Sequence, residues 1–191
     1  MASNQSKTTI PLHRPGFLEM LFFLVSGIIV SIPIAFFFEP SIGLLRSFFS
    51  GLQLEFFALV AVAPIVEEFA KAYPLFYRHG ESQRSIMILG SLVGLGFGIT
   101  EFFEYVLLID APIIARIPGV FFHVASAVTI AYGITTKRSA LFYLVAVGLH
   151  ASINLLAYFG QAGVPYALVL TIAYALPVAL YRRTSEKMIP F

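Results

Sequence analysis

Six apolar runs, each about long enough to cross a lipid bilayer as an α-helix, make up most of this 191-residue chain. The runs lie at 17–38, 54–77, 86–109, 115–135, 139–160 and 164–181. They predict an all-α, polytopic membrane protein of about six transmembrane helices, built as one domain over residues 17–181. Residues 1–16 are predicted to form a soluble N-terminal tail, and residues 182–191 a C-terminal tail.

The composition excludes several other classes. Hydrophobic residues make up 59% of the chain and charged residues 12%, which leaves too little polar surface for a soluble domain of this length. A disordered chain and a nucleic-acid-binding module are excluded on the same ground, so we expect a lipid bilayer and no nucleic acid as a partner. The chain has no Cys, which excludes disulfides, Cys-ligated zinc and thiol chemistry.

The Lys and Arg residues divide unequally between the two sides of the predicted layout. Six spans place nine of them on the side that holds both tails, two on the other side, and Lys71 inside the second span. The positive-inside rule then predicts that both termini are cytoplasmic and that the chain is a multi-pass protein of the cell membrane. Residues 39–53, between the first two runs, are expected to form an amphipathic turn of helix at the membrane interface.

Ionisable and polar residues lie deep inside four of the runs. A charge at the bilayer centre costs about 2.5–3.5 kcal/mol even on the gentlest scale, so such groups need a shared site. The depth of each group in the membrane follows from its distance in sequence to the end of its run. The carboxylates of the second run and the polar groups of the third to fifth runs all lie within a layer about two helical turns thick. The residues are Glu67, Glu68 and Lys71 in the second run, Glu101 in the third, His123 in the fourth, and His150 and Asn154 in the fifth.

These residue types predict hydrolysis. A carboxylate beside a neutral His can hold and deprotonate a water, and a second His or an Asn amide can stabilise the oxyanion of a tetrahedral intermediate. Inside a membrane, the reaction that needs these groups is cleavage of a peptide bond in an embedded or membrane-proximal substrate. The predicted catalytic residues are Glu67, Glu68, Glu101, His123, His150 and Asn154, and Lys71 is placed to neutralise either neighbouring glutamate.

Other intramembrane protease chemistries lack their motifs. There is no H-E-x-x-H for a zinc enzyme of the site-two type, and no G-x-S-x-G-like setting for a serine nucleophile. The single aspartate, Asp110, cannot form an aspartate pair. Of the known intramembrane protease chemistries, a mechanism that uses glutamate and histidine is the one that remains.

Four segments resemble the PrsW family of intramembrane proteases, related to the CAAX prenyl proteases and to the APH scaffold of γ-secretase. Glu67-Glu68-x-x-Lys71 resembles its EExxK motif, and Phe97-x-x-x-Glu101 resembles FxxxEN, with Phe102 in place of the usual Asn. The other two resemblances are Arg116 ahead of His123, and His150-x-x-x-Asn154.

The resemblance implies a Glu-activated water, with the final His and Asn near the oxyanion. It also implies single-span membrane proteins, such as anti-sigma factors, as substrates. Tyr105 and Arg116 are expected to support the site. Glu and His ligands would suit Zn²⁺ or another divalent metal, with Glu68, Glu101, His123 and His150 as candidate ligands, but the residues alone leave the metal and the oligomeric state open.

Two other functions fit the same polar residues. The first is a non-catalytic membrane scaffold of the same superfamily, in which the polar site would serve assembly. The second is a proton- or cation-coupled transporter, since buried Glu and His also form relays. The short chain without an internal repeat argues against the transporter.

Overall fold

The computed structural model describes residues 13–45, 51–77, 82–161 and 163–186, and within these ranges it is helical without a strand. The predicted all-α fold is therefore confirmed. The elements follow one another as α1 (Phe17–Leu45), α2 (Gly51–Phe57), η1 (Ala58–Val62), α3 (Ala63–Ala72), η2 (Tyr73–Tyr77), α4 (Gln83–Leu108), α5 (Ile113–Thr135), α6 (Ser139–Tyr158) and α7 (Val164–Arg182).

Five of the six predicted spans appear as helices long and apolar enough to cross a membrane. The second predicted span, 54–77, differs: it is a run of helical pieces, α2, η1, α3 and η2, of which the longest has 10 residues. Residues 1–12 and 187–191 of the predicted tails lie outside the described residues. Of the predicted interfacial segment at 39–53, the first part continues α1 to Leu45, residues 46–50 lie outside the described ranges, and α2 begins at Gly51.

Proline explains where the second run is interrupted. Pro64 has no N–H, and it stands at the start of α3 directly after a π-helical turn, η1. In this turn the N–H of Ala63 bonds to the carbonyl of Ala58, five residues back, in place of the α-helical partner four residues back. Pro74 lies at the other end, where α3 gives way to the 3₁₀ turn η2. The run thus remains helical throughout, with irregular turns on both sides of the α3 segment.

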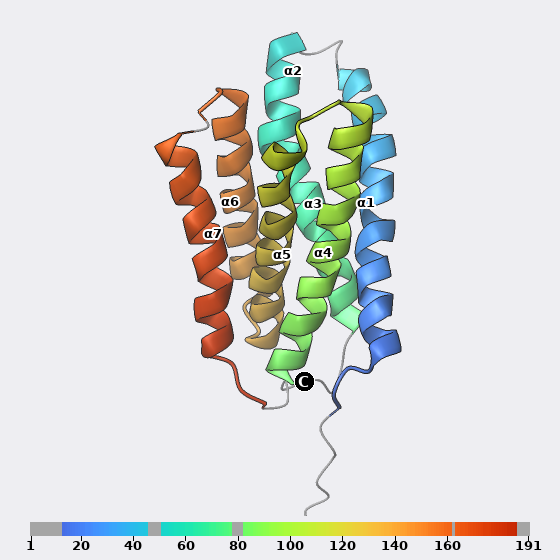
Figure 1. Ribbon diagram of the computed structural model, residues 1–191, viewed down its shortest axis with the longest axis vertical. Coiled ribbons are helices and arrows are strands. Elements are labelled where there is room, and N and C mark those ends of the chain that lie inside the picture. Colours follow the sequence, from blue (N-terminus) through green and yellow to red (C-terminus); the bar gives the residue numbers. More distant parts are fainter. Residues whose placement is uncertain (1–12, 46–50, 78–81, 162, 187–191) are drawn as a thin grey trace, which may run out of the picture.

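The helices form one bundle with α4 and α5 at its centre (Figure 1). Half of the apolar window of α4 and 44% of that of α5 are buried, against 17% for α1, α6 and α7. Figure 1 shows that α1 begins and α7 ends at the same end of the bundle. This arrangement agrees with an even number of crossings.

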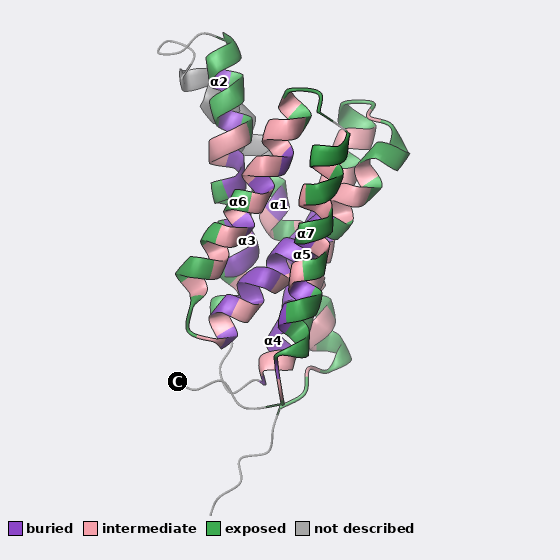
Figure 2. Ribbon diagram, turned by 90° about the vertical axis from the view of Figure 1, so that its left-hand side faces the viewer, coloured by how far each residue is buried: buried purple, intermediate pink, exposed green. Residues whose placement is uncertain are grey.

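The outer surface of the bundle carries large apolar side chains. Ile114 is 83% exposed, Leu18 78% and Phe17 73%, a degree of exposure that a water-soluble monomer avoids. In Figure 2, α7 is largely exposed, while the buried segments gather where α3, α4 and α5 meet. Such a surface suits the hydrocarbon of a bilayer.

Glycines let the central helices approach one another closely. A Cβ at Gly94 would meet the His123 carbonyl and lie 2.7 Å from the Cα of Val124, so α5 would have to move. A Cβ at Gly148, within α6, would meet nothing within 4 Å. The close contact between α4 and α5 therefore depends on Gly94 and places His123 against α4.

We expect Gly94→Ala and Gly148→Ala to change stability in opposite directions. Overpacking at Gly94 should lower the free energy of unfolding by about 1–3 kcal/mol. The same change at Gly148 should raise it by about 0.5–1 kcal/mol, because alanine costs less conformational entropy in a helix. Unfolding of the purified protein in detergent checks both values, and equal effects at the two positions would show that Gly94 does not set the α4–α5 distance.

Candidate active site

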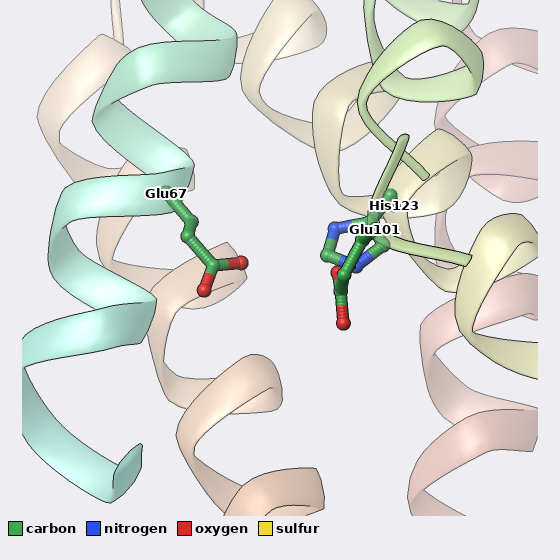
Figure 3. Close-up of side chains that lie close together, drawn as sticks. All are labelled: Glu67, Glu101 and His123. Atoms are coloured by element: carbon green, nitrogen blue, oxygen red, sulfur yellow. The ribbon is translucent and has the colours of Figure 1, made fainter. Parts of the chain in front are cut away.

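The predicted site residues converge from four helices at the centre of the bundle. Glu67, Glu68 and Lys71 come from α3, Glu101 from α4, His123 from α5 and His150 from α6. Figure 3 shows the Glu67 carboxylate directed from one side toward Glu101 and His123, which lie together on the other. Residues up to 83 positions apart in the chain thus form one cluster.

Lys71 is completely buried, and three hydrogen bonds satisfy the three N–H groups of its ammonium. It donates to Glu68 Oε1 at 2.6 Å, to His123 Nδ1 at 2.9 Å and to Ser126 Oγ at 3.0 Å. Because Nδ1 of His123 accepts, its Nε2 carries the proton of the neutral ring. Ser126 was not predicted as a site residue, although its position three residues after His123 places it on the same face of α5.

Glu68 is buried and accepts hydrogen bonds from Lys71 and His150. Its Oε1 accepts from Lys71 and, at 2.8 Å, from His150 Nδ1. The carboxylate and Lys71 are both fully inaccessible to solvent. Glu68 therefore joins α3 to α6 and compensates the charge of Lys71.

Glu101 bridges His123 and Arg116. His123 Nε2 contacts Glu101 Oε2, and Arg116 Nη2 donates to Glu101 Oε1 at 2.7 Å. The guanidinium of Arg116 also stacks over the Tyr105 ring, 3.6 Å from its centroid. Arg116 thus contacts one oxygen of the Glu101 carboxylate and His123 the other, and Tyr105 packs against the Arg116 guanidinium.

Glu67 has hydrogen-bonding capacity to spare. Its Oε2 is buried and makes no hydrogen bond to any described residue, and it lies 3.7 Å from His150 Nε2. The side chain is 15% exposed, whereas Glu68 is sealed. The two adjacent glutamates, indistinguishable in the sequence, therefore stand in different environments.

Asn154 lies on the same helix as His150 but its amide is used elsewhere. Asn154 Nδ2 donates to the backbone carbonyl of Leu59 at 2.8 Å, in the π-helical turn η1. The structure therefore brings Glu67, Glu68, Lys71, Glu101, His123 and His150 together, and places Asn154 next to them on the α2–α3 side.

The chemistry of the cluster fits a divalent metal. Glu67, Glu101 and His123 each offer one ligand atom, and these atoms lie within 4.8 Å of one another. Two carboxylates and one imidazole suit Zn²⁺, and the Glu67 Oε2 atom is buried without a hydrogen-bond donor. This group contains Glu67 where the sequence pointed to Glu68, and it does not include His150.

Apolar helices that surround buried glutamates and histidines are typical of a helical membrane protein with a hydrolytic active site. Comparison with models of protein families identifies the family. The model of the PrsW family of intramembrane metalloproteases matches residues 17–181, so the chain belongs to this family. No curated protein and no solved structure gives a match. The family confirms that the chain is a membrane protein and a protease.

Proposed function

We propose that the protein is an intramembrane endopeptidase in which Glu67 activates the attacking water. The observation that carries the proposal is the buried Glu67 Oε2 without a hydrogen-bond donor, on a carboxylate that is directed toward Glu101 and His123. A general base must have a lone pair available to a water within hydrogen-bonding distance. Glu68 and Glu101 already accept from cations, so Glu67 is the carboxylate best able to take a proton.

The other residues hold this base and its surroundings. Glu67 takes the proton of the water and returns it to the leaving amine nitrogen of the cleaved bond. His150 donates through Nδ1 to Glu68, so it can stabilise the oxyanion through Nε2, 3.7 Å from Glu67 Oε2, when the ring is doubly protonated. Lys71 orients His123 by donating to its Nδ1 atom, and Glu68 orients His150 by accepting from its Nδ1 atom. Arg116 orients the carboxylate of Glu101.

The family description implies a metal, and the residues fit one. Glu67, Glu101 and His123 would hold it, and a divalent ion bound there would act as a Lewis acid toward the scissile carbonyl or the water. Each of the three residues contributes one ligand atom, so Glu67 keeps a second carboxylate oxygen. Neutral His123 would have to carry its proton on Nδ1 to bind a metal through Nε2, so Lys71 Nζ could then no longer donate to Nδ1.

The remaining proposals concern placement and substrate. We infer six crossings of the cell membrane, with the helical run α2–η2 as the second, and both termini in the cytoplasm; the excess of Lys and Arg on that side supports this orientation. Single-span membrane proteins are the proposed substrates, because a site among apolar helices is reached within the bilayer. The relationship to the CAAX prenyl proteases and the γ-secretase scaffold stays a prediction.

New protein N-termini test the proposed function directly. They are compared between membranes that contain the native chain and membranes that contain Glu67→Gln at equal abundance. We expect termini in or near the spans of other membrane proteins with the native chain alone. Ser152→Ala is the control, because the Ser152 hydroxyl donates to the Gly148 carbonyl of its own helix. Identical sets of termini from native and Glu67→Gln membranes would contradict the proposal and favour the scaffold.

A further inference from the structure

In the π-helical turn η1, the backbone carbonyl of Leu59 has neither an α-helical nor a π-helical backbone donor. The N–H of Ala63, four residues after Leu59, bonds to Ala58, and the residue five positions after Leu59 is Pro64, which has no N–H. A carbonyl at membrane depth has no bulk water to replace the missing donor, so it must be satisfied by the protein.

A side chain of α6 supplies the donor. Asn154 Nδ2 bonds to the Leu59 carbonyl at 2.8 Å, 95 residues away in sequence. A second α6 side chain reaches the same helical run, because Tyr143 Oη donates to the Ile65 carbonyl at 2.8 Å. These two hydrogen bonds join α6 to backbone atoms on both sides of Pro64.

His150 lies on the same stripe of α6 as these two residues. Tyr143, His150 and Asn154 are spaced by seven and four residues, which places all three on one helix face. His150 contacts Glu68 at 2.8 Å between the two backbone anchors. The stripe therefore fixes the register of α6 against the helix that carries both glutamates.

We propose that Asn154 and Tyr143 are positioning residues, which hold Glu67 and Glu68 against His150 by binding the Leu59 and Ile65 carbonyls. Asn154 then acts through the backbone of η1 and does not stabilise the oxyanion itself. The role in catalysis rests on the proposed function, whereas the mechanical link between Asn154 and the Pro64 turn does not.

A double-mutant cycle between Asn154 and Pro64 tests the link. Pro64→Ala restores an N–H next to the turn and gives the Leu59 carbonyl a route to a backbone donor. We expect Asn154→Ala to lower the folding equilibrium constant about three- to fifteenfold in the native background, the range of hydrogen bonds between membrane helices. In the Pro64→Ala background the loss should be less than about twofold. The full chain is titrated with denaturing detergent in mixed micelles, and equal losses in the two backgrounds would overturn the proposal.

Cleavage rates separate positioning from oxyanion binding. A positioning Asn154 predicts that the double variant cleaves as fast as Pro64→Ala alone. An oxyanion donor predicts a loss of about 10²-fold in both backgrounds. If the native chain cleaved nothing, the proposed function would fail, while the folding cycle would still decide on the link.

Tyr143→Phe provides a second variant that keeps the aromatic ring. It removes the hydrogen bond to Ile65, whose i+4 donor Phe69 lies within α3. We expect a lower kcat with KM unchanged and a smaller loss of stability than for Asn154→Ala. Ser152→Ala, on the same helix, should change neither value. An unchanged kcat in Tyr143→Phe would remove Tyr143 from the proposal.

Discussion

Glu68→Gln is expected to destabilise the protein by about 3–5 kcal/mol, because it leaves the ammonium of Lys71 buried without its counter-charge. Both side chains are fully inaccessible, and Nζ and Oε1 are 2.6 Å apart. The variant Lys71→Met should cost a similar amount for the reciprocal reason. Unfolding of the purified chain in detergent measures both free energies.

The double variant and a surface pair provide the controls. With both charges removed, the combined loss should be clearly smaller than the sum of the two single losses, since no unpaired charge is left. Glu186→Gln removes an exposed partner of Arg84, 3.6 Å away, and should change stability by less than about 1 kcal/mol. Additive losses at Glu68 and Lys71 would mean that the pair is not coupled in the folded protein.

Glu67→Gln is expected to have the opposite profile, with a large loss of activity and no loss of stability. Its Oε2 is buried without a hydrogen-bond donor, so removing the charge relieves a cost and breaks no hydrogen bond made by that atom. Cleavage should fall by about 10³-fold, within the range for removal of a general base. If Glu67 also ligates the metal, binding of Zn²⁺ should weaken markedly in the same variant.

Isothermal titration with Zn²⁺ and cleavage assays on the same preparations check these expectations. Glu67→Gln is compared with Gly148→Ala, which alters no group of the site. Retained cleavage in Glu67→Gln would transfer the role of base to another residue. Unchanged Zn²⁺ binding would remove Glu67 from the ligand set while leaving its role as base to the rate measurement.

Much of the fold could be predicted from the sequence, because a helix that crosses a bilayer requires a long run of apolar residues. Five runs correspond to single helices; the ends of four lie within three residues of the prediction, whereas α1 continues seven residues beyond the predicted end, to Leu45. The second run did not, because Pro64 and Pro74 remove backbone donors locally while the average hydropathy over the run is unchanged. Hydropathy reports whether a segment enters the bilayer and is insensitive to the hydrogen-bonding pattern within it.

The residues that make up the site could also be predicted from the sequence, whereas the different roles of these residues could not. Helical spacing placed Lys71 within reach of both Glu67 and Glu68 and could not choose between them. The choice depends on which direction the α3 helix faces and on His150 from α6, which binds Glu68. The use of Asn154 by the Leu59 carbonyl depends on a π turn, and spacing along α6 carries no information about it.

Two ion pairs join residues that are close in sequence, and this affects how the protein enters the membrane during synthesis. Lys71 pairs with Glu68 three residues away, and Arg116 pairs with Glu101 across the short connection between α4 and α5. Each cation is thus neutralised by the helix or hairpin that is inserted with it, before distant helices have been made. The α4–α5 hairpin can therefore leave the translocation machinery as one unit, with the charge of the partly exposed Arg116 already paired inside it.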